Sequence, residues 1–538
     1  MFKKIFLFFI FLVLVFSRFF YLDRFPVGIS HDELEYILSA KSYFSSGTDL
    51  SGVSFPASIF QTNTLGSISF LPALVLSPYY GLVPLNQFTA RLPYVIVNLL
   101  TAFVFYLLVK KLFQNKNFAI LSSILFLANP WSFYLSRTAS DTAFALLFYL
   151  LGINFILDKS SKKLFLSFLF LVLGFFSYHG AKPILIPLVL VCLFGFKTKL
   201  NIKPKLLFLF GIVAVFSLYF LGSRFFSNSA SQTRSQEILF LNKDLISQTV
   251  NTDRQASLES PLKNIFTNKP TISLEIFFQK YFSAFSPDTL FISGDNSGTY
   301  RFSRHGLFYL VDFIFIIIGL ISLFKKYPNQ AKFLSLLILI SPLATAISTV
   351  GTSTVNRSFL LFPILIIFSS FGIFSVNKFL SLLIFISFTG FLYFYFFRFP
   401  IIGQENYFFS QRVISNYIVR NNTSNLIVVD SEPREIFLET AFYSSKNKTE
   451  NATFTSTCPQ DFNPKITYII KSSICPLKMD NIKSINEEQF GGPLYYIVND
   501  SLCSSYPSQK YLRFHLIKDY LLEKMENSNF CQTWIKSI

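Results

Sequence analysis

The sequence predicts an all-α polytopic membrane bundle of about eleven transmembrane helices, followed by a small C-terminal α/β domain. The first observation behind this prediction is composition. Of 538 residues, 52% are hydrophobic, only 14% are charged, and 71 are Phe. A soluble protein cannot hide that much apolar surface, so lipid is the solvent for most of the chain. The second observation is that long apolar runs alternate with short lysine-rich loops as far as residue 398, after which the composition is that of a soluble domain.

The membrane also explains the basic excess of the chain. Lys and Arg number 47 against 29 Asp and Glu, which gives a net charge of +18. In a soluble protein this excess would indicate a nucleic-acid partner. Here the lysines lie in short loops between apolar runs, which is the pattern of cytoplasmic loops in membrane proteins. We therefore expect no nucleic acid among the partners, and the sequence has no Gly-rich phosphate loop.

The first apolar run sets the predicted orientation. Lys3 and Lys4 keep its N-terminal end in the cytoplasm, and no small-residue cleavage site follows, so it is predicted to be an uncleaved span rather than a signal peptide. An odd number of spans then places the C-terminus outside (N-in/C-out). The predicted spans are 3–21, 91–109, 118–136, 141–157, 164–179, 183–196, 206–222, 305–324, 332–349, 357–376 and 379–397.

This topology places every loop of mixed charge on the extracytoplasmic face of the cell membrane, where we expect the site. The first outer loop, 22–90, has apolar residues at near-helical spacing over 32–44, which predicts an amphipathic helix in the interface. Residues 66–82 predict a second interfacial or re-entrant helix. The large outer loop, 223–304, is polar at first and aromatic later.

Residues 1–398 are thus assigned to the membrane domain and residues 399–538 to an extracytoplasmic α/β domain. Strands are predicted at 426–429, 466–470 and 495–498, and helices at 405–419, 432–444 and 511–526. Four of the five cysteines lie in this domain, which predicts one or two disulfides with three pairings open, or free thiols if the compartment is reducing. These disulfide candidates are Cys458, Cys475, Cys503 and Cys531.

Residues 28–36, Gly-Ile-Ser-His-Asp-Glu-Leu-Glu-Tyr, put three carboxylates and a histidine beside the membrane surface. Taken alone, this stretch is typical of a helix N-terminus, with Ser30 or Asp32 as the N-cap. The context favours a site, because ionisable groups at a membrane are costly and are usually functional or paired. Further ionisable residues open other spans on the same predicted side, namely Arg91, Arg137, Asp141 and Arg357.

Several arginines and acids near one surface indicate a site for an anionic lipid headgroup, since Arg binds phosphate oxygens in pairs. Sugar transfer from a polyprenyl-phosphate donor needs this combination. A carboxylate takes the proton of the acceptor as its oxygen attacks the anomeric carbon, and a cation stabilises the charge that develops on the leaving phosphate. A nucleotide-binding motif is not required, because the sugar arrives on a lipid.

At these residues the sequence resembles the GT-C superfamily of polytopic glycosyltransferases. Within it, the sequence is similar to glycosyltransferase family 39, the group of protein O-mannosyltransferases and lipid A aminoarabinose transferases. The resemblance covers residues 1–398 and depends on the order of its pieces. The pieces are Pro26-Val27-Gly28-Ile29-Ser30-His31-Asp32-Glu33 with Ala40 and Gly47; Ala90-Arg91-Leu92-Pro93; Lys110-Lys111-Leu112-Phe113; Asn129-Pro130 with Ser136-Arg137 and Asp141; Ser177-Tyr178-His179-Gly180-Ala181-Lys182; Phe285-Ser286-Pro287-Asp288 with Gly294-Asp295 and His305-Gly306; and Asn356-Arg357-Ser358.

The resemblance implies an inverting hexosyl- or pentosyltransferase with Asp32 as general base and Arg91 near the donor phosphate. It implies a catalytic neighbour in Glu33. It also implies site-lining roles for Asp141, Tyr178, His179 and Arg357, to which the residue pattern adds Arg137. Some relatives hold a divalent cation, for which Glu33, His179 and His305 are candidate ligands, although no ligand spacing demands a metal. The alternative interpretation of His31 and His305 is that they are polar residues at the membrane interface.

Two other functions stay open beside the enzyme. A transporter or flippase of lipid-linked sugars would place ionisable groups near mid-span and often shows inverted repeats, neither of which the sequence has. In a non-catalytic protein of cell-envelope glycan assembly, the acidic residues would be polar residues of the membrane interface without a functional role. The sugar and its lipid, glycan or protein acceptor are not predicted, and the C-terminal domain lacks the β-trefoil repeats that would favour a protein acceptor.

Overall fold

In the computed structural model the chain is mainly helical and folds as two compact units. Unit 1 comprises Met1–Phe20, Ser39–Gly81 and Pro93–Tyr393, and unit 2 comprises Tyr21–Leu38, Leu82–Leu92 and Phe394–Ile538. The acidic stretch at residues 30–35 therefore belongs to the same unit as the tail, by which we mean residues 399–538. The structure describes residues 2–60, 69–158, 160–196, 201–226, 237–295, 304–349, 354–376, 380–403, 405–421, 425–444, 452–475, 482–487, 492–506 and 521–537.

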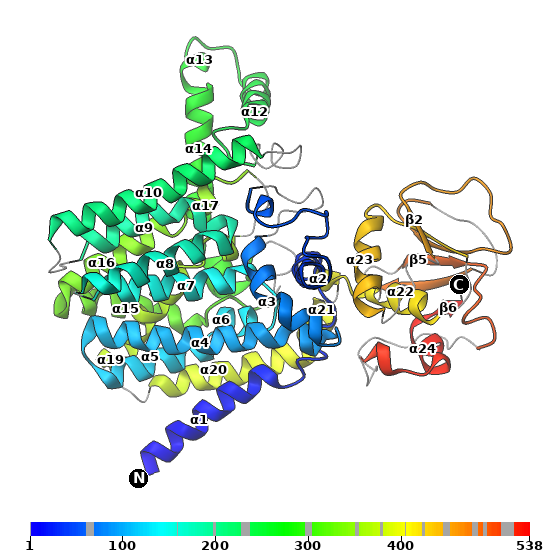
Figure 1. Ribbon diagram of the computed structural model, residues 1–538, viewed down its shortest axis with the longest axis horizontal. Helices are drawn as coiled ribbons and strands as arrows, with labels where there is room; N and C mark the ends of the chain where they lie inside the picture. Colours follow the sequence, from blue (N-terminus) through cyan, green and yellow to red (C-terminus); the bar gives the residue numbers. More distant parts are fainter. Residues whose placement is uncertain are drawn as a thin grey trace. The chain divides into compact units, whose positions relative to one another are not determined.

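Helices form at each of the eleven predicted apolar segments and pack as a bundle (Figure 1). Two of these segments are broken, one before Pro130 and one before Leu343, so that each forms a long helix followed by a short one. The bounds are α1 (Phe2–Phe19), α4 (Gln87–Phe113), α5 (Lys116–Ala128), α6 (Pro130–Leu135), α7 (Asp141–Ile156), α8 (Ser161–Ser177), α9 (Lys182–Phe194), α10 (Ile202–Phe225), α15 (Leu310–Lys326), α16 (Pro328–Ile340), α17 (Leu343–Ala346), α19 (Leu361–Val376) and α20 (Ser381–Tyr393).

Some helices of the bundle have the length and the apolar composition that a membrane span needs. Within the described residues, three helices are long and apolar enough to cross a membrane, namely Gln87–Phe113, Ile202–Phe225 and Leu382–Ile402. Shorter apolar helices of 10–17 residues accompany them. The predicted number of spans and the N-in/C-out orientation are not tested by these lengths and stay predictions.

Close backbone contact and buried polar groups hold the bundle together. A Cβ atom on Gly319 of α15 would overlap the carbonyl oxygen of Phe368 in α19, so glycine allows these two helices to approach. Arg18 of α1 is fully buried, and its Nε donates to Oδ1 of Asn98 at 3.2 Å. Such bonds satisfy polar groups where no water is at hand.

The two predicted outer loops are also helical. The first carries α2 (His31–Ser46), the 3₁₀ turn η1 (Ala57–Ile59) and α3 (Phe70–Leu82), which confirms both predicted helices, although 61–68 lie outside the described residues. Their placement in the interface stays a prediction. The large loop forms an arm beyond the bundle (Figure 1). Its elements are α12 (Lys243–Gln255), α13 (Lys263–Phe266), α14 (Lys269–Ser283) and the π-helix η3 (Asp288–Ile292), with α18 (Thr354–Arg357) following later in the chain.

The tail is an α/β domain around a mixed six-stranded sheet of order β2-β1-β3-β5-β4-β6. β1 pairs in parallel with β2 and β3, and the remaining pairs are antiparallel. The strands are β1 (Leu426–Val429), β2 (Ala452–Thr455), β3 (Thr467–Lys471), β4 (Lys483–Glu487), β5 (Gly492–Val498) and β6 (Lys536–Ser537). Its helical elements are α21 (Phe399–Ile402), η7 (Glu405–Tyr407), α22 (Phe409–Arg420), α23 (Pro433–Tyr443), η10 (Leu522–Lys524) and α24 (Asn527–Trp534), and the π-helix η6 (Phe394–Arg398) directly precedes them.

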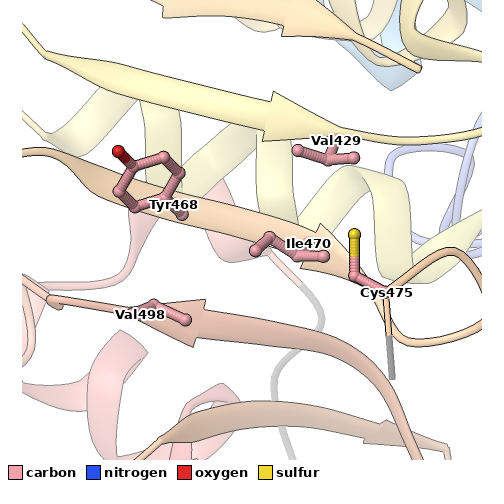
Figure 2. Close-up of a cluster of buried hydrophobic side chains, with 5 residues drawn as sticks. All are labelled: Val429, Tyr468, Ile470, Cys475 and Val498. Atoms are coloured by element: carbon pink, nitrogen blue, oxygen red, sulfur yellow. The ribbon is translucent and has the colours of Figure 1, made fainter. Parts of the chain in front are cut away.

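A buried apolar cluster explains why this sheet forms (Figure 2). Val429, Ile470 and Val498 come from the neighbouring strands β1, β3 and β5, and Val429 is the register partner of Ile470. Two disulfides form in the tail, one from Cys458 to Cys475 and one from Cys503 to Cys531 of α24. Most of the predicted helix 511–526 lies outside the described residues.

Candidate active site

The acidic stretch of residues 30–35, called the acid motif below, opens helix α2 with a reciprocal cap. The backbone N–H and the hydroxyl of Ser30 both donate to Oε1 of Glu33 at 3.2 Å, and the Glu33 N–H donates back to the Ser30 hydroxyl at 3.4 Å. This confirms Ser30 as the N-cap, and it assigns Glu33 to the cap. Ser30, Glu33 and Glu35 are buried, whereas Asp32 is exposed in the first turn. Asp32 is therefore the carboxylate of the motif that faces outward.

Residues 26–28, called the held loop below, lead into the acid motif and are bound by Arg91. Its Nη1 donates to the carbonyl oxygen of Pro26 at 2.9 Å, and its Nη2 donates to that of Gly28. Its Nε lies 3.6 Å from Oε2 of Glu33, and the Arg91 side chain is fully buried. These contacts join the held loop to the helix cap. The donor-phosphate role predicted for Arg91 is not tested by them and stays a prediction.

A second buried arginine, Arg412 of α22, binds the middle of the same loop. Its Nη1 donates to the carbonyl oxygen of Val27. Its Nε and Nη2 bind the two carboxylate oxygens of Glu523 at 3.0 and 2.8 Å. A Cβ atom on Gly28 would overlap the carbonyl oxygen of Tyr407, so glycine permits the close approach of the loop to η7. The three carbonyls of residues 26–28 are thus bound by two arginines.

A third arginine, Arg434, binds the far side of the acid motif from the first turn of α23. Its Nη2 donates to Oε1 of Glu35 at 2.8 Å, and its Nη1 lies 3.2 Å from Oε1 of Glu435. Burial raises the pKa of Glu35 to about 7, because it outweighs the hydrogen bond and the charge of Arg434; Glu435 and Asp32 add to the rise. Burial likewise raises the pKa of Glu435.

His31 lies between α22 and α23. Its ring stacks on Phe408 with centroids 3.6 Å apart, and its Nε2 lies 2.8 Å from Oε1 of Gln411. Its Nδ1 is 3.9 Å from a carboxylate oxygen of Glu432 and 3.7 Å from one of Glu435. These contacts make His31 part of the packing between the acid motif and the tail.

The predicted residues of unit 1 form their own buried and half-buried groups. Arg137 is fully buried, and its Nη1 donates to the carbonyl oxygens of Ser17 and Arg18 at 3.2 and 2.9 Å. Asp141 is buried at the start of α7. Both residues lie within the bundle of unit 1, and their predicted roles toward a substrate stay predictions.

Tyr178 and His179 lie at the turn between α8 and α9, with Tyr178 before the 3₁₀ turn η2 (His179–Ala181). His179 Nδ1 is 3.0 Å from Nζ of Lys182, which also donates to the Tyr219 hydroxyl at 2.6 Å. Lys182 ends the stretch 177–182 that resembles the family, and no role was predicted for it. Its ammonium supplies positive charge at this turn. It is a candidate phosphate-binding group that the sequence analysis did not single out.

Arg357 ends α18 and is half-buried. It lies close enough to Lys280 of α14 to lower the pKa of that lysine, an effect that adds to the larger one of burial. Lys280 Nζ donates to the carbonyl oxygen of Ser348. Two cations held near each other favour an anion between or beside them. Lys280 had no motif around it that would have identified it from the sequence.

The described residues contain no group of three or more His, Cys, Asp and Glu side chains that could hold a metal ion. Of the candidate ligands, Glu33 accepts from Ser30 and lies near Arg91, the Nδ1 of His179 lies 3.0 Å from Nζ of Lys182, and the Nδ1 of His305 lies 2.7 Å from the carbonyl oxygen of Gly306. The acid motif presents one exposed carboxylate, that of Asp32, on a helix end whose neighbouring carboxylates contact Arg91 and Arg434.

Comparison with known proteins gives one family match. Residues 69–223 match the model of the family described as dolichyl-phosphate-mannose-protein mannosyltransferase. The match covers less than a third of the chain, and over this segment it confirms the predicted resemblance to the protein O-mannosyltransferase group. The segment includes Arg91, Arg137, Asp141, Tyr178 and His179, but neither Asp32 nor Arg357.

Among solved structures, a match is the crystal structure of ArnT from Cupriavidus metallidurans bound to undecaprenyl phosphate. The sequence identity is 11%, the TM-score is 0.47, and the match covers 91% of this chain and 97% of that one. No curated protein sequence matches the chain.

Proposed function

We propose that this protein is an inverting membrane glycosyltransferase that moves a sugar from a polyprenyl-phosphate donor to an acceptor at the extracytoplasmic face, with Asp32 as the general base. The observation that carries the proposal is the exposed carboxylate of Asp32 within an otherwise buried motif. A structural cap alone would not need it, because Ser30 and Glu33 already complete the cap. The family match supports a donor in which the sugar is carried by a lipid phosphate.

The proposed step is a single displacement. Asp32 accepts the proton of the acceptor hydroxyl, whose oxygen attacks the anomeric carbon from the side opposite the phosphate. The bond between that carbon and the phosphate oxygen breaks, and the polyprenyl phosphate leaves with the bonding electron pair. The configuration of the anomeric carbon is thereby inverted. Asp32 lies in the first turn of α2, at the end of the helix where the dipole favours negative charge.

The leaving phosphate needs positive charge. Within unit 1, two sets of cations have the chemistry to bind a phosphate, Lys182 beside His179 and Arg357 beside Lys280. Preorganised cations stabilise charge that develops on a leaving group without first having to reorient. We include Glu33 and Arg91 in the proposal as the pair that keeps the start of α2 in place. Arg137, Asp141 and Tyr178 remain proposed site-lining residues.

The test uses proteoliposomes and a panel of radiolabelled polyprenyl-phosphate sugars, with transfer to lipid, glycan or protein acceptors as the readout. We expect transfer by the wild type and a loss of about 100-fold or more in Asp32→Asn at equal protein level, because general-base catalysis contributes on this scale. Asp244→Asn is the matched control, since Asp244 is an exposed carboxylate in the first turn of another helix, α12.

Transfer that survives in Asp32→Asn would contradict Asp32 as the base. If the wild type transfers no sugar from any donor but moves lipid-linked sugar across the bilayer, the flippase function replaces the enzyme.

A further inference from the structure

The tail contacts the acid motif at the carboxyl ends of its parallel strands, which is where α/β folds bind ligands. β1 and β3 run in parallel, β2 lies on the other side of β1, and the strand order therefore reverses at β1. Ligands of such sheets bind beyond the carboxyl ends of the strands at this point. Here that position is occupied by the loop from Asp430 to the start of α23, which presents Arg434 to Glu35.

This loop is itself firmly held. Asp430 is fully buried and accepts hydrogen bonds from the backbone N–H of Glu432 at 2.8 Å and from Nζ of Lys471 at 3.2 Å. The Tyr495 hydroxyl donates to its second oxygen. The start of α23, and with it Arg434, is therefore fixed by strands β1, β3 and β5 before it meets the acid motif.

The contacts on the acid motif lie on opposite sides of its helix. Successive residues of an α-helix are separated by about 100° around the axis, so Glu33 and Glu35 point about 200° apart. Glu33 lies 3.6 Å from Arg91, and Glu35 lies 2.8 Å from Arg434. Asp32 lies in the same turn, so the contacts of Glu33 and Glu35 fix the backbone that carries its side chain. Arg412 adds a third restraint through the carbonyl of Val27.

We propose that Arg434 and Arg412 are positioning residues for catalysis. The tail binds the acid motif of its own chain at the carboxyl ends of its parallel strands, where other α/β domains bind a ligand. The carboxylate of Glu35 takes the place that an external ligand has in other α/β domains. The inference rests on the proposed function, because it takes Asp32 as the base whose position matters. It gives the tail a catalytic purpose without placing any tail residue on the substrate.

The experiment compares Arg434→Ala, Arg434→Lys and Arg420→Ala in the full-length protein in proteoliposomes. Arg420 is the matched control, because it is an arginine of the same domain that donates to Asn527 and to the carbonyl of Leu522, both within the tail. The first readout is kcat and KM for sugar transfer. The second is hydrogen exchange at the backbone amides of residues 31–35, which does not depend on activity.

We expect Arg434→Ala to lower kcat by about tenfold or more with KM nearly unchanged, because a small displacement of a catalytic group costs rate rather than binding. Arg434→Lys keeps the charge and should recover part of kcat. Exchange at residues 31–35 should be faster in Arg434→Ala than in the wild type and in Arg420→Ala.

Wild-type kcat and wild-type exchange in Arg434→Ala would overturn the inference. So would equal losses in Arg434→Ala and Arg420→Ala, because the cause would then be a general weakening of the tail. The proposed function is judged separately by Asp32→Asn: if that variant is inactive while Arg434→Ala behaves as the wild type, only the positioning role fails.

Discussion

Arg91 and Arg412 bind the same loop although they lie far apart in the sequence. Both are fully buried, and both donate to carbonyls of the held loop, Arg91 at residues 26 and 28 and Arg412 at residue 27. They differ in their carboxylates. Arg91 faces Glu33 through one contact of 3.6 Å, whereas Arg412 binds both oxygens of Glu523. The loop before Asp32 is therefore bound twice, once by an arginine of residues 1–398 and once by an arginine of the tail.

The ion pairs of the two tail arginines, Arg412 with Glu523 and Arg434 with Glu35, differ in whether burial or the arginine determines the pKa of the carboxylate. Burial favours the neutral form of both Glu523 and Glu35. For Glu523, the charge and hydrogen bonds of Arg412 outweigh burial, and its pKa is lowered. For Glu35, burial outweighs Arg434, and the pKa rises to about 7. Besides the paired contact with Arg412, Glu523 accepts from Asn416, and its side chain is 30% exposed against 6% for Glu35, which also favours its ionised form.

The largest expected effect is that of removing the paired arginine. Arg412→Ala should lower the free energy of unfolding by about 3 kcal/mol, because the buried Val27 carbonyl loses its donor and the partly exposed Glu523 carboxylate loses a paired contact. Thermal and denaturant unfolding of the detergent-solubilised protein measure the change. Arg420→Ala should cost less, and an equal loss in the two variants would contradict the special place of Arg412.

A second prediction concerns the pH dependence caused by Glu35. Its pKa of about 7 lies above the ordinary 4.5, so the folded state binds the proton more tightly than the unfolded state does. The stabilising contribution is therefore complete below pH 4.5 and is lost as the pH rises through 7. The wild type should lose up to about 3 kcal/mol of stability between these limits that Glu35→Gln does not lose. Parallel stability curves for the two proteins between pH 5 and pH 8 would contradict this.

The smallest expected effect tests the close approach of the held loop. Gly28→Ala places a methyl group against the Tyr407 carbonyl, which should cost about 1–3 kcal/mol of stability and lower the transfer rate. Gly390→Ala is the control, because a Cβ there meets nothing within 4 Å and the residue lies inside helix α20. That control should leave the protein as stable as the wild type or about 0.5–1 kcal/mol more stable. Similar unfolding curves for both variants would remove the argument for Gly28.

Much of the fold could be predicted because its signals are local. Apolar runs mark the helices of the bundle, and the short aliphatic run Leu426–Val429 marks β1 with the bounds seen in the structure. The spacing of Ser30 and Glu33 marks the start of α2. By contrast, β2 (Ala452–Thr455) and β4 (Lys483–Glu487) were not predicted, because short polar strands depend on their neighbours for stability.

The site could be predicted only in part. Asp32 and Glu33 stand out in a sequence with few charges, and Arg91 opens an apolar run. Arg412 and Arg434 look like ordinary residues of soluble helices, and their roles come from partners far away in the sequence. One signal was available for Arg434: it follows a predicted strand at the start of a predicted helix, the place where α/β sheets bind ligands.

The most direct test of the central claim, that Asp32 is a general base held in place by its surroundings, is chemical rescue. Asp32→Ala leaves room for a small carboxylate, and transfer is measured with increasing formate. We predict that formate restores part of the transfer in Asp32→Ala and none in Arg434→Ala, where the base is present but displaced. Wild-type transfer by Asp32→Ala without formate would contradict the account, because the reaction would then need no base at this position.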